Sequence, residues 1–289
     1  TGRTNLAMIS QIIGAVTNMI LDPIMIFGLF GFPRLEVAGA AIATLCGQTV
    51  ATVIGLVLNV KKNPDIRLRA CEVRPHKKTV ADIYAIGIPS IIMQSIGSVM
   101  TFGMNNILIG FTEAATAVFG AYFKLQSFIF MPVFGLNNAT VPIIAYNYGA
   151  GKVNRLKKTV RLTIATAVTI MSLGFAAFEL IPAQLLGLFT PSEEMLAIGT
   201  TALRIIGIHF PLAGFCIIAG SVCQALGKPV YTLIISVCRQ IVVLLPVAFL
   251  LSLTGILDLV WLAFPISELT AVFMNMLFLR RTYRAKLEE

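Results

Sequence analysis

Eight long apolar segments divide almost the whole chain, separated by polar connectors. Each is long enough for a helix that crosses a bilayer, which takes about 20 residues. None shows the two-residue alternation that marks the strands of a membrane barrel. The segments are 5–29, 36–60, 81–108, 114–146, 158–181, 196–225, 230–253 and 257–279. The chain is therefore predicted to be an all-α, polytopic membrane protein with eight transmembrane helices.

The composition of the chain excludes an ordinary water-soluble domain. Hydrophobic residues make up 57% of the 289 positions and charged residues only 12%, whereas soluble domains carry about 25% charged residues. The five cysteines match no zinc-binding spacing, so we interpret them as small buried hydrophobic side chains and predict no metal site. The first residue is Thr1, and no signal-peptide pattern follows it. We therefore expect the chain to be a fragment that begins inside a longer protein.

The basic residues are distributed unevenly between the two sides of the predicted membrane. Eighteen of the 22 Lys and Arg residues lie before the first segment, in every second connector or in the C-terminal tail, and the alternate connectors hold only Arg34. Connectors rich in Lys and Arg stay on the cytoplasmic side. The pattern predicts that both ends of the chain are cytoplasmic. The net charge of +9 then marks orientation in the membrane and not a surface that binds nucleic acid.

The first apolar segment carries polar side chains on one helical face. Asn18 and Asp22 are four residues apart, and Pro23 removes a backbone N–H directly after the carboxylate. In the returning second segment, Thr44 and Gln48 lie at a similar depth, at about 1.5 Å of rise per residue. Because ionisable residues inside a membrane tend to face a cavity or a partner, this cluster could take up a proton or hold a small cation. The alternative is that Asp22 only stabilises a kink in the helix.

Other charged residues also fall inside predicted helices. Arg239 and Glu268 lie on consecutive helices, each about 15 Å from its own entry side, so we predict a structural ion pair between them. Lys124 either faces a cavity or extends along its helix to the membrane surface. His209 is either a hydrogen-bonded interior histidine or a proton carrier, with Arg204 one turn away as a neighbour.

Sequence motifs for catalysis are missing from the chain. It contains no nucleotide-binding loop, no G-x-S-x-G and no H-E-x-x-H. We therefore predict no catalytic residues and no cofactor. The polar residues at membrane depth indicate instead the passage of a solute coupled to an ion, either H⁺ or Na⁺.

Three stretches resemble one transporter family. They are "NMILDPIMIFGLFG" with "VAGAAIATLCGQ", "MPVFGLNNATVPIIAYNYGAGKVNRLKK", and "ALGKPVYTLIISVCRQIVVLLPVAFLLSLTGILDLVWLAFPISE". In order and content they are similar to helices five to twelve of MATE (multidrug and toxic compound extrusion) transporters. The resemblance implies a two-lobe, twelve-helix, inverted-V fold. Residues 1–60 would then be the last two helices of the N-terminal lobe, 61–80 a basic cytoplasmic linker, and 81–289 the six-helix C-terminal lobe with its tail.

The resemblance also implies roles for individual residues. In the family, an Asn-x-x-x-Asp pair and a Thr on the fifth and sixth helices belong to the ion site of the first lobe, and Asn18, Asp22 and Thr44 match them. Some members instead use carboxylates on the seventh and tenth helices, where this chain carries Gln94 and His209. The residues expected to face the substrate cleft are Gln48, Gln94, Lys124 and His209.

The function implied by these residues is secondary active multidrug efflux. Cationic, aromatic compounds would leave across the bacterial inner membrane in exchange for a proton or Na⁺. The expected partners are the lipid bilayer and small-molecule cationic drugs, without nucleic acid and without an obligate protein partner. The alternatives are a lipid-linked oligosaccharide flippase of the same superfamily and, from another class, a membrane-embedded enzyme.

Overall fold

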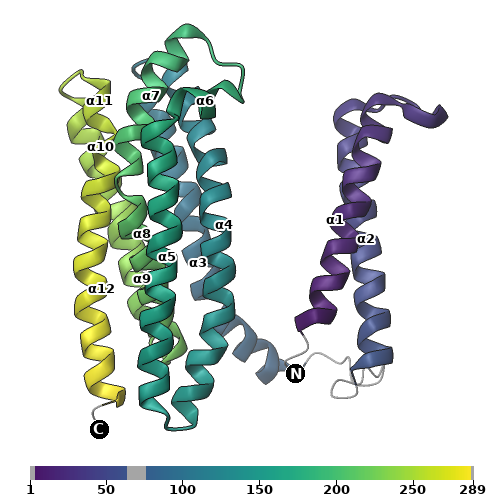
Figure 1. Cartoon of the computed structure of the whole chain (residues 1–289), viewed down its shortest axis with the longest axis vertical. Helices are drawn as coiled ribbons and strands as arrows, with labels where there is room; N and C mark the ends of the chain where they lie inside the picture. Colours follow the sequence, from purple (N-terminus) through teal and green to yellow (C-terminus); the bar gives the residue numbers. More distant parts are fainter. Residues whose placement is uncertain (1–3, 64–75, 288–289) are drawn as a thin grey trace. The chain divides into compact units, whose positions relative to one another are not determined.

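The computed structural model describes residues 4–63 and 76–287 and divides the chain into two units, residues 1–80 and 81–289. Within the described ranges the regular elements are helices, without a strand, as the fold class predicts (Figure 1). Six of these helices are long and apolar enough to cross a membrane, and one bent pair makes seven. The remaining predicted span, 81–108, corresponds to α3, which is not among them and has several side chains outside the described part. The number eight is therefore not confirmed.

The first unit is a hairpin of two long helices, α1 (Thr4–Phe27) and α2 (Glu36–Lys62), joined by the short helix η1 (Leu29–Gly31). Both helices are apolar runs of the length that a membrane span requires. Gly28 occupies the left-handed region at φ 73°, which favours glycine and ends α1. The hairpin therefore brings the polar positions of both helices to comparable heights.

Small residues bring α1 and α2 close together. A Cβ atom at Gly14 would lie 2.9 Å from the carbonyl oxygen of Gly47, and a Cβ at Gly47 would lie 2.8 Å from that of Gly14. Such glycine contacts allow backbones in a membrane to pack closely. The same contact lies beside Asn18, whose Cβ would be 3.0 Å from a Cβ at Gly47. Helix packing therefore determines the position of Asn18.

Gly47→Ala is expected to destabilise the hairpin by about 1–3 kcal/mol, because the added methyl group must push two backbones apart. Gly55→Ala in the same helix is the matched control. Its Cβ would lie 3.7 Å from the nearest heavy atom, Oγ of Ser10, so the methyl group fits without a clash. Because alanine favours helices more than glycine does, this variant should have a stability equal to or slightly above that of the parent chain. Thermal unfolding of the purified chain in detergent measures both. Equal melting temperatures for the two variants would contradict the close approach.

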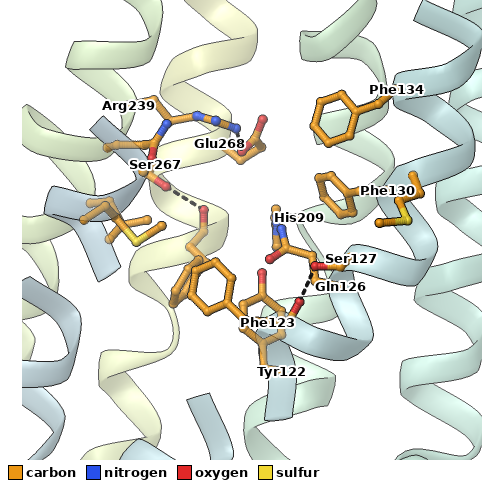
Figure 2. Close-up of a pocket in the computed structure, with 16 residues that line it drawn as sticks. Tyr122, Phe123, Gln126, Ser127, Phe130, Phe134, His209, Arg239, Ser267 and Glu268 are labelled. Carbon is orange, nitrogen blue, oxygen red and sulfur yellow. Dashed lines mark hydrogen bonds and ion pairs between the residues drawn. The ribbon is translucent and has the colours of Figure 1, made fainter. Parts of the chain in front are cut away.

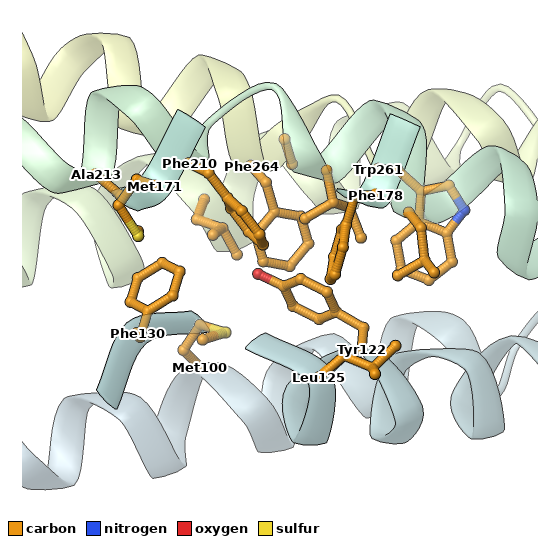
Figure 3. Close-up of a cluster of buried hydrophobic side chains, with 14 of the residues drawn as sticks. Met100, Tyr122, Leu125, Phe130, Met171, Phe178, Phe210, Ala213, Trp261 and Phe264 are labelled. Atoms are coloured by element: carbon orange, nitrogen blue, oxygen red, sulfur yellow. The ribbon is translucent and has the colours of Figure 1, made fainter. Parts of the chain in front are cut away.

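The second unit is a helical bundle in which α8 lies among several other helices and contacts α4, α5, α9 and α12. Its elements are α3 (Lys77–Leu108), α4 (Glu113–Gly149), α5 (Val153–Leu180), α6 (Pro182–Gly187), α7 (Glu193–Gly207), α8 (Phe210–Ala225), α9 (Pro229–Val237), the π-helix η3 (Cys238–Leu244), α10 (Leu245–Ser252), α11 (Leu257–Val260) and α12 (Ala263–Leu287). Their apolar faces meet in a core of large rings. Figure 3 shows Tyr122, Phe178, Phe210, Trp261 and Phe264 in this core.

Two prolines interrupt regular helix geometry in this unit. Pro211 lacks the N–H that a continuous helix would donate to the carbonyl of Gly207, and α7 and α8 meet there at an angle of 46°. Pro246 likewise cannot donate to the carbonyl of Val242, and the turn before it widens into the π-helix η3. Irregular turns of this kind are frequent at functional sites. Both interruptions border the cavity described below.

Candidate functional site

The first unit holds a polar cluster between α1 and α2. Nδ2 of Asn18 lies 3.2 Å from Oδ1 of Asp22 and 3.5 Å from Oγ1 of Thr44. The Thr44 hydroxyl donates to the carbonyl of Ala40 at 2.9 Å, so it accepts the hydrogen bond from the Asn18 amide. The structure thus brings together Asn18, Asp22 and Thr44, the three residues that the sequence predicts as an ion site.

A cavity of about 290 Å³ adjoins this cluster. Asn18, Thr44 and Gln48 line it together with small residues of both helices, whereas Asp22 lies outside its lining. Gln48 was predicted to face the substrate cleft, and within this unit it is exposed beside the ion cluster. Pro23 does not end α1, which continues for another turn to Phe27. The carboxylate is therefore held inside a continuous helix.

The chemistry of this cluster suits a hard cation or a proton. A carboxylate, an amide oxygen and a hydroxyl are oxygen ligands of the kind that small hard cations prefer. Asn18 and Asp22 are half-buried, and Thr44 is exposed within the unit. Among the described residues there is no group of three His, Cys, Asp or Glu side chains that could bind a transition metal. Asp22 would therefore supply the negative charge that balances a bound cation.

The second unit contains a buried ion pair. Nη1 of Arg239, in η3, donates to Oε2 of Glu268, in α12, at 3.0 Å. Glu268 is 2% exposed. The pair joins the two helices on which the sequence placed it. What the sequence did not indicate is that both side chains also line a cavity.

That cavity has a volume of about 400 Å³, and five of its 16 described lining residues are Phe or Tyr. Figure 2 shows the Arg239–Glu268 pair on one side and the rings of Phe130 and Phe134 on the other, with His209 between them. Tyr122, Phe123 and Phe264 complete the aromatic part of its wall. Arg239 and Phe134 also line a second, more polar cavity of about 380 Å³. Cavities of this size and lining are typical of small-molecule sites.

His209 follows the break after α7 and lies in the interior of the second unit. The residue is 4% exposed, and its Nδ1 bonds to the carbonyl of Ile206. Arg204 is not its partner, because the guanidinium is exposed and donates instead to the carbonyl of Glu179 at 3.3 Å. The two residues are five positions apart, a spacing that puts side chains on different faces of a helix. His209 is thus a hydrogen-bonded interior histidine that lines the aromatic cavity.

The remaining predicted cleft residues are not in this wall as the structure describes it. Lys124 is exposed, and its Nζ lies 5.6 Å from the ring centroid of Phe189. It directly follows the lining residue Phe123 in α4 but is not itself among the described residues that line the cavity. The side chain of Gln94 lies outside the described residues.

Comparison with known proteins identifies the family. A sequence model of the MatE family matches residues 89–250, which are more than half of the chain. The chain belongs to the MatE family. An FAD transporter from Shewanella oneidensis is 29% identical over 270 residues, which cover 93% of this chain and 60% of the relative. The multidrug export protein MepA from Staphylococcus saprophyticus is 29% identical over 261 residues, which cover 90% of this chain and 56% of the relative. This MatE chain thus spans less than two thirds of the length of these relatives.

Solved structures agree with the family assignment. A MATE protein in the straight conformation matches with a TM-score of 0.87 and 26% identity. The match covers 100% of this chain and 64% of the solved chain. The outward-facing conformation of a multidrug resistance MATE family transporter has a TM-score of 0.85 and 25% identity, with coverage of 98% and 63%. The inward-facing conformation of such a transporter has a TM-score of 0.78 and 26% identity, with coverage of 99% and 66%. The MATE resemblance and the all-α membrane fold are confirmed. The curated relatives are named as transporters and export proteins, so the prediction that this MatE chain is not an enzyme is confirmed as well.

Proposed function

We propose that the complete protein is a secondary active multidrug exporter. It exchanges a proton or Na⁺ for cationic, aromatic compounds across the bacterial inner membrane. The similarity to proteins named as multidrug export proteins supports this function, and the alternating basic connectors support cytoplasmic ends for the chain. As an exporter it needs the bilayer and small-molecule drugs, but no cofactor and no obligate protein partner.

The observation that carries the proposal is the hydrogen-bonded cluster of Asn18, Asp22 and Thr44. One Asn18 amide is close to both the carboxylate of α1 and the hydroxyl of α2. Protonation of Asp22 weakens a charge-assisted hydrogen bond, whereas Na⁺ would draw the three oxygen atoms together. Either event changes the contact between two helices that already pack backbone to backbone through Gly14 and Gly47. Ion uptake can therefore alter the packing of the hairpin.

Alternating access would then follow from rocking of the two lobes around a central drug site, as in other transporters built from repeats. Relatives of this fold have been solved in outward-facing and inward-facing conformations. Binding of the ion from outside would weaken drug binding, and return of the ion-loaded form would complete the cycle. Gln48, Gln94, Lys124 and His209 are the residues of this chain proposed to face the drug.

Reconstitution of the complete transporter in liposomes tests the coupling. A fluorescent cationic drug is loaded on one side, and either a pH gradient or a Na⁺ gradient is imposed at zero membrane potential. We expect one of the two gradients to drive drug movement, and drug addition to release the same ion. If neither gradient moves the drug, the proposal is wrong. Movement of lipid-linked oligosaccharide without drug would favour the flippase.

Thr44→Val is expected to weaken ion-driven transport by about fivefold, the factor that corresponds to one hydrogen bond of about 1 kcal/mol. Valine keeps the shape of the side chain but removes the acceptor for Asn18. Thr49→Val is the matched control, because its hydroxyl is exposed and bonds only to the carbonyl of Leu45 in the described structure. The half-maximal ion concentration for transport in liposomes is the measurement. If both variants weaken transport equally, the loss comes from a change in helix α2 in general and not from the polar cluster.

A further inference from the structure

The aromatic cavity of the second unit has charged groups that already balance each other. Among its described lining residues, Arg239 and Glu268 are the two that carry opposite charges, and they bond at 3.0 Å. A cation in this cavity would find no carboxylate that lacks a partner, and an anion would find no unpaired guanidinium. Bringing a charge out of water without a partner is unfavourable. The cavity therefore favours an uncharged ligand.

His209 offers a hydrogen-bond acceptor to this cavity. A carbonyl oxygen can only accept, so the bond between Nδ1 and the carbonyl of Ile206 requires the proton on Nδ1. The neutral ring then has an unprotonated Nε2, which is an acceptor. In the described part of the chain no hydrogen bond of this second nitrogen is found. The side chain is 4% exposed and lines the cavity.

A second acceptor in the same wall is also incompletely bonded. Oε1 of Glu268 is buried and has no hydrogen-bond partner among the described atoms, since Arg239 bonds to Oε2. Buried polar atoms in proteins nearly always have a partner. This oxygen is shielded from the cavity, however, so the acceptor that a ligand can reach is Nε2 of His209, and a ligand that satisfies it must bring a donor.

The remaining wall determines the shape of the ligand. Phe130 and Phe264 have ring centroids 6.4 and 6.0 Å from that of His209, and Figure 2 shows Phe123 and Phe134 around the same space. Flat rings stack or meet edge to face at such separations. A volume of about 400 Å³ is enough for a molecule of two or three fused rings.

We propose that this cavity binds an uncharged, flat aromatic molecule with an N–H or O–H group that donates to Nε2 of His209. The site lies within the second unit and contains His209, one of the residues proposed to face the drug, so it extends the proposed function from cationic compounds to uncharged ones. Its occupancy needs no ion gradient, so the proposal stands or falls independently of coupling at Asp22.

Three bicyclic probes of nearly equal size test the proposal. They are 2-quinolone, which is neutral with one N–H donor; 1-methyl-2-quinolone, which is neutral without it; and the cation 1-methylquinolinium. Binding to the purified chain in lipid nanodiscs is measured by equilibrium dialysis at neutral pH, with empty nanodiscs subtracted. We expect saturable binding of 2-quinolone, and binding about tenfold weaker for both other probes, from the loss of a hydrogen bond to a buried acceptor. Equal binding of the two neutral probes, tighter binding of the cation, or absence of saturable binding would overturn the proposal.

Variants locate the donor contact. His209→Phe keeps a ring but removes the acceptor, so we expect it to abolish the difference between the two neutral probes and to leave 1-methyl-2-quinolone unchanged. His209→Gln retains an acceptor oxygen and should preserve part of the difference, which guards against a folding defect in the first variant. Tyr146→Phe is the control, because Tyr146 is on the same helix as Phe130 but is exposed and outside the described lining. A loss of discrimination in Tyr146→Phe, or its persistence in His209→Phe, would assign the binding to another site.

Discussion

Asp22→Asn in the complete transporter is expected to abolish drug resistance while the protein still inserts and folds. Asparagine has the same shape, and its amide oxygen can accept the bond that Asn18 now gives to Asp22 at 3.2 Å. What it loses is the negative charge and the ability to take up a proton. Because the cluster has no other carboxylate among the described residues, no neighbour replaces that charge.

Growth of cells in the presence of a cationic drug, together with drug accumulation and the amount of protein in the membrane, measures the effect. Asp258→Asn is the matched control, since Asp258 is an exposed carboxylate in the first turn of α11. We expect normal resistance from Asp258→Asn and the level of the empty host from Asp22→Asn. Full resistance with Asp22→Asn at normal protein levels would exclude this residue from coupling.

The polar cluster was predictable because it depends only on regular helix geometry. A spacing of four residues puts Asn18 and Asp22 on one face, and counting 1.5 Å per residue down a hairpin puts Thr44 opposite them. The helices α1 and α2 are uninterrupted over these positions. The similar depths estimated for Arg239 and Glu268 in the membrane also predicted that these two side chains would meet. Helical periodicity and depth along a span can both be counted directly from the sequence.

The aromatic cavity was not predictable in the same way. Its wall draws on α3, α4, the break at His209, the π-helix η3 and α12, and so depends on how five parts of the fold pack. The π-helix shifts side chains away from the positions that a regular helix would give them. Pro246 and Pro211 were the signals in the sequence that such irregularities occur. The expectation that Arg204 would lie beside His209 was wrong for a simpler reason, because residues five positions apart lie on different faces even of a straight helix.

Removing one partner of the buried pair between Arg239 and Glu268 is expected to destabilise the second unit by about 3–5 kcal/mol. Arg239→Leu leaves a carboxylate that is 2% exposed without a counter-charge. The double variant Arg239→Gln with Glu268→Gln replaces the ions by two amides that can bond to each other. It should recover most of the loss, because no unpaired charge remains. Thermal unfolding in detergent, followed by circular dichroism, provides the melting temperatures.

Glu179→Ala is the control for this prediction, because the Arg204–Glu179 pair is of the same kind in a different environment. Its atoms are 4.0 Å apart, and the side chains are 55% and 48% exposed. Exposed pairs contribute about 0–1 kcal/mol, so this variant should unfold close to the parent chain. If Arg239→Leu is equally mild, the carboxylate must reach water or bind a proton without cost. Glu268 would then be an accessible ionisable group in the cavity wall, and the cavity would no longer be neutral.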